Sequence, residues 1–290
     1  MKEKPYYDNG QASLVGNRRE NQDRCILVES GNTILLGLAD GMGGHPRGEV
    51  AAQILIDSCR QLLRRTPLPI RYPGSFLNQL LHRAHEGILA YGHSQSPPIE
   101  PRTTAVVALI QDDTAYWVHA GDSRLYLFRD GDILAQTTDH SYVERLQQQG
   151  IISAQQKEHH PQRNYVTRCL GGSSPLPEAE LGIHQLRAGD VLMLCSDGVW
   201  GSIDAALMSD ALCSRMSIAD AARALVEEAT QAAYPESDNA TLIAVKLETP
   251  VSKTQPTASK VQGNDELNLA IAELQNAIDS YEIEKKQENS

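Results

Sequence analysis

The run from Ile34 to Glu49 begins as apolar sequence, stops abruptly at Asp40 and continues into a glycine-rich stretch. An apolar run followed by glycines is typical of a buried strand that ends at the edge of a sheet, where backbone can approach a ligand closely. The alternative is that Asp40-Gly41 only turns the chain, as most Asp-Gly pairs do. We therefore expect a core strand whose last carboxylate is placed either for chemistry or for a turn.

Other aspartates in the chain help to separate these alternatives. Asp130-Gly131 lies between two short strand-like runs and predicts a plain hairpin without chemistry. Apolar runs also adjoin Asp122, Asp197 and Asp238. Carboxylates at the ends of separate strands can converge, and ionised carboxylates that share a pocket need positive charge to offset their repulsion. Oxygen ligands without His or Cys favour Mg²⁺ or Mn²⁺ over zinc.

Composition excludes some classes of function. The chain has 290 residues, 41% of them hydrophobic, with a net charge of -11 and a pI near 5.3. One large domain with an appendage fits this length as well as two domains do. The acidic balance argues against a nucleic-acid partner. The five cysteines form no close pairs, which predicts free thiols in a reducing compartment. No signal peptide or membrane span is evident, so we expect a cytoplasmic protein.

The loop from Gly16 to Asp23 contributes Arg18, whose planar guanidinium matches two phosphoryl oxygens at once. Taken alone, an arginine in such a charged loop is more often solvated surface than a ligand. Eight motifs occur in order: Arg18-x-x-Asn-Gln-Asp23, Ala39-Asp-Gly-Met-Gly-Gly44, Arg102-Thr-Thr-Ala105, His119-Ala-Gly-Asp-Ser-Arg124, Thr138-Asp-His-Ser141, Asn164-Tyr-Val-Thr-Arg168, Ser196-Asp-Gly198 and Ser237-Asp-Asn-Ala-Thr241. Together they resemble the protein phosphatase 2C (PPM) family, bacterial type, over about residues 11–247.

The resemblance implies a role for each of the singled-out residues. Asp40 resembles the carboxylate that bridges two metal ions, and Gly41 would offer its carbonyl to one of them. Asp197 and Asp238 match the remaining ligands of the first ion. Asp23 matches the acidic residue of the second ion, Asp122 matches a ligand of a third, weaker ion, and Arg18 matches the phosphate-binding arginine.

Two positions depart from the pattern of eukaryotic members. Met42 stands where those members have a histidine that is a candidate general acid, and Met42 cannot transfer a proton. The proton for the leaving group would then come from water or another residue. Gln22 stands where a glutamate is often found, so the second ion would be held more weakly or through water. Bacterial members resemble this chain at both points.

Apolar spacing supplies the fold expectation. Segments 48–65, 75–91 and 219–232 have helical spacing, whereas 105–110, 115–118, 125–128, 133–135 and 190–197 are strand-like. We expect an α+β fold, a four-layer α-β-β-α sandwich of two antiparallel sheets flanked by helices, which is the architecture that the family implies. The region near 147–161 resembles the family's flap, a segment that shapes substrate choice.

The C-terminal residues differ from the rest of the chain in composition and apolar spacing. The catalytic domain is expected over 1–247, and 248–264 has the composition of a flexible linker. Within 265–286, apolar residues recur at spacings of three and four, typical of a coiled-coil helix. It docks back on the catalytic domain, pairs with a second copy or binds another protein. The alternative is an acidic tail with no fixed partner.

The function expected is that of a signalling enzyme, a metal-dependent protein serine/threonine phosphatase. A water bridging two Mg²⁺ or Mn²⁺ ions would attack phosphoserine or phosphothreonine in proteins that a Ser/Thr kinase has modified. Two other classes stay open: a silent phosphoprotein-binding relative, against which the intact acidic positions argue, and an adaptor acting through the C-terminal helix. A kinase is excluded because neither a nucleotide loop nor a His-Arg-Asp motif is present.

Overall fold

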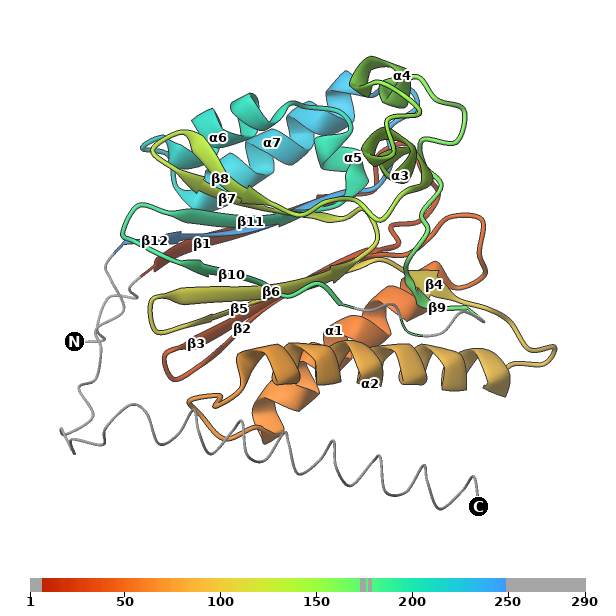
Figure 1. Ribbon diagram of the computed structural model, residues 1–290, viewed down its shortest axis with the longest axis horizontal. Coiled ribbons are helices and arrows are strands. Elements are labelled where there is room, and N and C mark those ends of the chain that lie inside the picture. Colours follow the sequence, from red (N-terminus) through yellow and green to blue (C-terminus); the bar gives the residue numbers. More distant parts are fainter. Residues whose placement is uncertain (1–6, 173–175, 177–178, 249–290) are drawn as a thin grey trace. The chain divides into compact units, whose positions relative to one another are not determined.

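Two five-stranded antiparallel sheets lie face to face between two layers of helices, as the computed structural model shows (Figure 1). The structure describes residues 7–172, 176 and 179–248. The linker expected at 248–264, apart from Glu248, and the helix expected at 265–286 lie outside the described residues.

Both sheets combine hairpins of consecutive strands with strands that are distant in sequence. The first sheet has the order β1 (Tyr7–Leu14), β12 (Ala240–Leu247), β11 (Val191–Cys195), β7 (Arg124–Arg129) and β8 (Asp132–Gln136). The second has the order β10 (Gly182–Gln185), β6 (Thr114–Ala120), β5 (Ala105–Gln111), β3 (Thr33–Asp40) and β2 (Asp23–Ser30). A short pair, β4 (Arg102–Thr103) and β9 (Leu170–Gly171), forms a separate ribbon.

Helices cover the outer face of each sheet. The second sheet is covered by α1 (Gly48–Arg65) and α2 (Pro73–Ser94), and the first by α5 (Asp197–Trp200), α6 (Ala205–Cys213) and α7 (Ile218–Ala232). The expected four-layer α+β sandwich is confirmed, and its helices at 48–65 and 219–232 match the observed α1 and α7 closely. Within the described ranges, none of the helices combines the length and apolar character needed to cross a membrane.

Burial explains why the central strands are continuously apolar. One cluster of buried side chains lies between the sheets, and two further clusters lie between each sheet and its helices. Strand β3 is therefore buried on both faces, with every residue except its last buried. Leu35 packs toward the helices, whereas Leu36 packs toward the other sheet. Only Asp40, at the end of this strand, reaches the edge.

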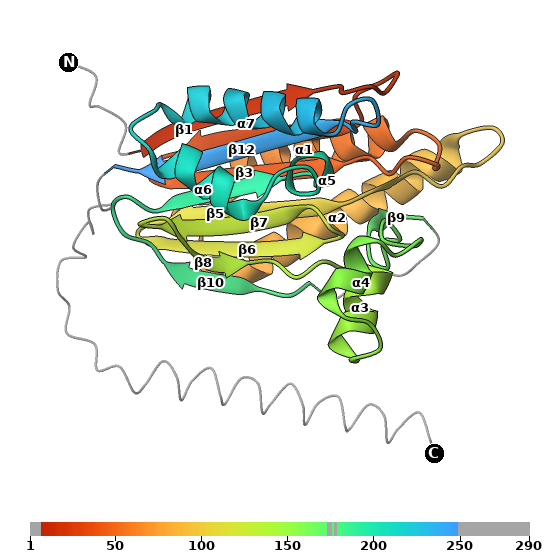
Figure 2. The same cartoon turned by 90° about the horizontal axis from the view of Figure 1, so that it is seen from above.

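The Asp130-Gly131 pair forms the plain hairpin that the sequence predicts. It joins β7 to β8, and both residues have positive φ, at 52° and 97°. Such angles are those of the tight turns that suit twisted strands. At the opposite end of the sheets, α3 (Tyr142–Gln148) and α4 (Ala154–Glu158) project from the sandwich (Figure 2).

Candidate functional site

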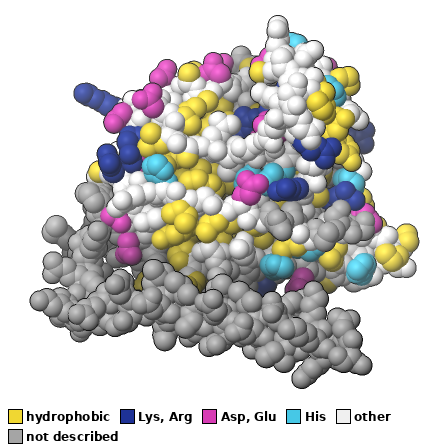
Figure 3. Space-filling view, viewed as in Figure 1, with side chains coloured by type: hydrophobic (Ala, Val, Ile, Leu, Met, Phe, Trp, Pro, Cys, Tyr) yellow, Lys and Arg dark blue, Asp and Glu magenta, His cyan; other side chains and the backbone are white. Residues whose placement is uncertain are grey.

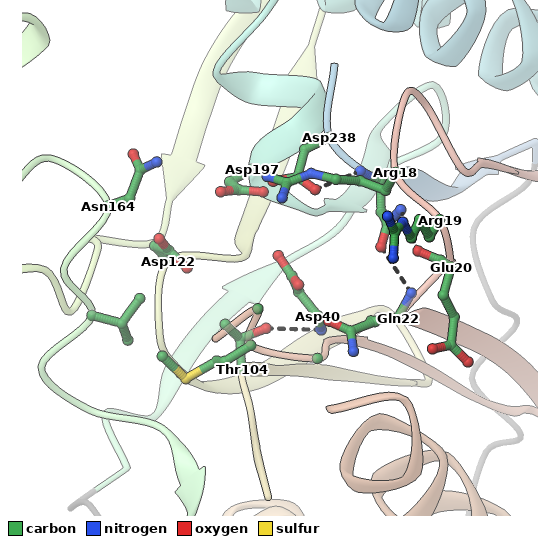
Figure 4. A pocket seen from close by; sticks show the side chains of 15 residues that line it. Arg18, Arg19, Glu20, Gln22, Asp40, Thr104, Asp122, Asn164, Asp197 and Asp238 are labelled. Carbon is green, nitrogen blue, oxygen red and sulfur yellow. Dashed lines mark hydrogen bonds and ion pairs between the residues drawn. The ribbon is translucent and has the colours of Figure 1, made fainter. Parts of the chain in front are cut away.

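A cavity of about 370 Å³ opens at the end of the sandwich where β3 and β11 finish (Figure 4). It is lined by Arg18, Arg19, Glu20, Gln22, Asp40, Gly41, Met42, Gly43, Thr104, Asp122, Asn164, Val166, Asp197, Asp238 and Asn239. No histidine lines this cavity, so the described residues offer no imidazole to the site.

Four of the predicted aspartates meet in this cavity, two from each sheet. Asp40 is the last residue of β3, and Asp122 follows β6 in the same sheet. Asp197 follows β11, and Asp238 precedes β12. In Figure 4, Asp40 points toward Asp197 while Asp122 faces both from another wall. Strand ends therefore gather carboxylates that lie up to 198 positions apart in the printed sequence.

Burial makes this concentration of negative charge costly. It raises the pKa of Asp40 well above its usual range, and the charges of Asp23 and Asp197 raise it further. Burial, with the charge of Asp197, also raises the pKa of Asp122 to about 8. The pKa of Asp197 is raised to about 6 by burial and by Asp238. The pocket thus holds more carboxylates than its own surroundings stabilise as anions, a condition that a bound cation relieves.

Asp23 differs in position from the other four aspartates. It pairs directly with Asp40 in the β2–β3 register, yet it does not line the cavity. Its Oδ2 accepts a hydrogen bond of 2.7 Å from Ser196, and its Oδ1 is buried without a hydrogen-bond partner. Burial raises its pKa to about 7. Asp23 therefore lies behind Asp40, and its expected service as a direct ligand of the second ion stays a prediction.

Asp40 is held in place through its backbone. Its N–H donates to Thr104 Oγ1 at 3.0 Å, and its carbonyl accepts from Thr104 N at 2.8 Å and from Thr103 Oγ1 at 2.9 Å. The next residue must be glycine because a Cβ on Gly41 would lie 2.5 Å from the backbone of Gly48, where α1 begins. The turn can therefore bring backbone, as well as the carboxylate, to the cavity.

Arg18 lies at the rim, with its Nη2 2.7 Å from Asp238 Oδ2. The loop that presents it is fastened by Asn239, whose Oδ1 accepts from Gln22 N and whose Nδ2 donates to the carbonyls of Val15 and Glu20. The sequence motif contained Asn239 without indicating this role. The partners of its hydrogen bonds are more than 210 positions away in the sequence, so no local sequence pattern predicts them.

An outer wall, defined here as residues 164–166, closes the cavity on the side of α3. Asn164 and Val166 line the cavity, and Val166 forms a β-bridge with Ser141. Tyr165 O accepts a hydrogen bond of 2.8 Å from Tyr142 N. The wall is therefore fixed to the start of α3 by backbone hydrogen bonds.

The donor chemistry of the cavity suits hard divalent cations. Its anionic ligands are carboxylates, which Mg²⁺ and Mn²⁺ accept readily. Among residues 7–172, 176 and 179–248, no three acidic, histidine or cysteine side chains are drawn together as a ready-made metal cage. The site is instead open, and one of its carboxylates is engaged by Arg18. Asp40, Asp197, Asp238 and the Gly41 carbonyl are the groups present for the core site, with Asp122 across the cavity.

Comparisons with known proteins agree on one family. A model described as protein phosphatase 2C matches residues 11–233. The serine/threonine protein phosphatase PstP of Mycobacterium tuberculosis is 34% identical over 237 residues, covering 80% of this chain. The serine/threonine phosphatase of S. agalactiae superposes with a TM-score of 0.76 at 28% identity, over 84% of this chain and 100% of that one. The PstP catalytic domain in complex with two manganese ions superposes with a TM-score of 0.70 at 30% identity, over 83% and 98%.

The extent of the match differs between these relatives. The aligned segment covers 44% of the whole PstP protein, whereas it covers nearly all of the two solved chains. The similarity therefore concerns the part of the chain that forms the two sheets, their helices and the aspartate pocket.

Proposed function

Since this chain belongs to the protein phosphatase 2C family, we propose that it is a metal-dependent protein serine/threonine phosphatase. The observation that supports this proposal best is the meeting of four aspartates and Arg18 in one pocket. The relatives that carry this fold are serine/threonine phosphatases, and one was solved with two manganese ions. The reaction is hydrolysis of phosphoserine or phosphothreonine in a protein, without a covalent phosphoenzyme.

In this mechanism Asp40, Asp197, Asp238 and the carbonyl of Gly41 would hold two Mg²⁺ or Mn²⁺ ions, and Asp122 would serve a third. When bound, the ions supply the positive charge that the carboxylates lack and activate a water as nucleophile. Asp23, behind Asp40, adds negative charge that strengthens the hold of the pocket on cations. Thr104 fixes the backbone of Asp40, so its carboxylate keeps one orientation through the reaction.

Arg18 would bind the phosphoryl group of the substrate. Its side chain is 56% exposed, so it can turn from Asp238 toward a ligand at the pocket mouth. Its planar fork then stabilises two phosphoryl oxygens as charge develops on them. Met42 lies in the pocket without an acidic proton, and no histidine lines it. The leaving serine or threonine oxygen would therefore take its proton from water in this open cavity.

The decisive experiment measures hydrolysis of a phosphothreonine peptide by the full-length chain with Mn²⁺ or Mg²⁺. We expect activity that a chelator abolishes and that falls by on the order of a thousandfold in Asp40→Asn, since the bridging position is lost. Asp130→Asn, in the distant hairpin, is the matched control and should retain activity. Absence of hydrolysis by folded, metal-loaded wild type would contradict the proposal.

We further propose that the substrates are phosphoproteins made by a Ser/Thr kinase in a bacterial cytoplasm, as part of signalling. All five cysteines are free, which suits a reducing compartment. The face shown in Figure 3 mixes basic and acidic side chains, with no continuous basic surface there. We retain 1–247 as the catalytic domain, and residues 265–286 as a helix for self-association or partner binding. Deleting residues 248–290 should then leave peptide hydrolysis intact while abolishing any such association.

A further inference from the structure

Strand β7 begins beside the pocket with Arg124, which makes a buried bidentate ion pair with Asp139. The Arg124 Nε lies 2.7 Å from Asp139 Oδ1, and its Nη2 lies 2.8 Å from Oδ2. The two side chains are only 15% and 4% exposed. Paired charge-assisted hydrogen bonds of this kind fix orientation as well as distance. Neither residue lines the cavity, so any influence on it is indirect.

The residue after Asp139 connects this ion pair to the outer wall. His140 N donates to Gly121 O at 2.9 Å, and Gly121 N donates to His140 Nδ1 at 3.3 Å. The His140 carbonyl accepts from both the N–H and the hydroxyl of Thr167, at 2.7 and 2.9 Å. The position of Asp139 therefore sets where the wall residues just before Thr167 lie relative to the Gly121-Asp122 turn.

Arg124 also contacts the opposite side of the pocket through Trp200. Its guanidinium carbon lies 3.5 Å from the centroid of the Trp200 ring, close enough for a strong cation–π contact. The indole Nε1 donates a hydrogen bond of 2.9 Å to the carbonyl of Asp122. Trp200 ends α5, the short helix that begins with Asp197. One guanidinium thus joins the elements that carry Asp122, Asp197 and the outer wall.

Side chains do not fill all the space around the Arg124–Asp139 pair. A second cavity of about 230 Å³ lies there, and its lining includes Arg124, Asp139, Glu144 and Lys157. Glu144 of α3 pairs with Lys157 of α4, so this pair joins the two helices to each other. The Arg124–Asp139 pair is the charged link from the segment that contains Asp139 to β7, and it lies beside two hydrogen bonds that join Thr137 to Leu125.

We propose that Arg124, Asp139 and Trp200 form a positioning unit that sets the outer wall, residues 164–166, relative to Asp122 and Asp197. The proposal rests on the proposed phosphatase function for its kinetic consequences. Arg124 acts through Asp139 on the wall that faces a bound peptide, and through Trp200 on the backbone of Asp122. None of the three is a catalytic residue, because none lines the cavity.

The same strand supplies a matched control for a merely structural role. Arg129 ends β7, and its Nε and Nη2 lie 2.7 Å from the two carboxylate oxygens of Asp190. The side chains are 20% and 1% exposed, close to the values of the Arg124–Asp139 pair. This second ion pair does not touch the pocket or the outer wall. Substitutions in the two pairs should therefore cost similar stability and differ in their effect on the site.

The first readout is hydrogen exchange of the metal-free, full-length chain, which requires no activity. In Asp139→Asn and Arg124→Lys we expect exchange of the Tyr142 and Thr167 amides to speed up by on the order of tenfold, because the residues that carry the outer wall lose their charged link to β7. Asp190→Asn should leave these two amides unchanged. If Arg124→Lys does not fold, Asp139→Asn carries the comparison, because it keeps the side-chain shape.

The second readout separates the two ends of the unit kinetically. Asp139→Asn should raise KM for a phosphothreonine peptide by on the order of tenfold and leave hydrolysis of p-nitrophenyl phosphate within about twofold, since only the peptide reaches the wall. Trp200→Phe keeps an aromatic face for Arg124 but removes the donor to Asp122. Trp200→Phe should raise the Mn²⁺ concentration needed for half-maximal activity by on the order of tenfold.

The positioning proposal would be overturned if Asp139→Asn and Asp190→Asn changed the exchange of the Tyr142 and Thr167 amides equally. It would also be overturned if Asp139→Asn left the exchange of these amides unchanged. The same holds if Asp139→Asn lowers hydrolysis of the phosphothreonine peptide and of p-nitrophenyl phosphate by the same factor. If the wild type hydrolyses neither compound, the proposed function fails. The exchange comparison still decides whether Arg124 and Asp139 position the wall.

Discussion

Asp197→Asn should stabilise the metal-free protein although it removes a buried side chain from its native role. Burial, with the charge of Asp238, raises the pKa of Asp197 from 3.8 to about 6. One pKa unit corresponds to about 1.4 kcal/mol, so ionised Asp197 costs the folded state up to about 3 kcal/mol relative to the unfolded chain. Asparagine has the same shape, carries no charge and can donate an N–H to Asp40.

The pH dependence follows from the direction of that shift. A carboxyl whose folded pKa is raised stabilises the fold fully below its unfolded pKa, and this stabilisation is lost as pH rises through its folded pKa. Wild type without metal should therefore lose stability between about pH 4 and pH 7 on account of this group. Asp197→Asn lacks this loss, so its advantage should be small at pH 4.5 and full at pH 8.

Divalent metal should reverse the ranking. An ion that binds only the folded state stabilises it by about 4.1 kcal/mol at about 1,000 times its Kd, which exceeds the cost of ionised Asp197. Wild type should gain this stabilisation with Mn²⁺, whereas Asp197→Asn lacks a ligand and should gain much less. One substitution thus stabilises the protein in chelator and makes it the less stable of the two in saturating metal.

The assay is urea unfolding at pH 4.5 and 8, with chelator at both and with Mn²⁺ at pH 8. Asp190→Asn is the control, since it removes a buried carboxylate that is paired with Arg129 and should destabilise the protein by about 3 kcal/mol with or without metal. A metal-free Asp197→Asn protein that is less stable than wild type at pH 8 would refute the reasoning, because crowding of carboxylates would then not be a cost to the fold.

Two further substitutions test how the pocket loop is held and used. Gly16 has φ +59°, and a Cβ there would lie 2.2 Å from Asp238 O, so Gly16→Ala should cost more than about 2 kcal/mol in urea unfolding and lower phosphatase activity. Gly31→Ala, at φ +57° with nothing nearer than 3.9 Å, is its control and should cost only about 1 to 2 kcal/mol. Arg18→Lys should raise KM for a phosphothreonine peptide about tenfold, since lysine lacks the planar fork, and should leave unfolding unchanged because the ion pair is exposed. A KM unchanged by Arg18→Lys would contradict phosphate binding by this arginine.

The layers of this fold were predictable because apolar spacing reports which faces are buried. The segments 48–65 and 105–110 correspond to α1 and β5 within one residue at each end. The expected helix at 75–91 is longer in the structure, Pro73–Ser94, because a proline is well tolerated in the first turn of a helix. Strand order was not readable, since β1 pairs with β12 from the opposite end of the sequence.

The aspartates of the pocket were predictable for a different reason. A carboxylate that ends an apolar run is placed at the edge of a sheet, and Asp40 and Asp197 follow this rule. Residues that act through tertiary hydrogen bonds, such as Thr104 and Asn239, carry no such local signal. For Asp23 the motif position was clear from the sequence, but its burial was not. That burial, with its hydrogen bond from Ser196, depends on how the two sheets stack.

The pairing of β1 with β12 bears on how the chain could be re-engineered. Tyr7 and Leu247 are register partners, while Leu14 and Ala240, seven residues along, pair near the pocket. At about 3.3 Å per residue, these two ends of the strand pair lie roughly 23 Å apart, and Tyr7 and Leu247 are at the end far from the pocket. A short peptide could link Leu247 to Tyr7, with new termini opened in the β5–β6 turn at Asp112. Such a circular permutant would keep every strand of both sheets and leave the pocket end of the molecule untouched.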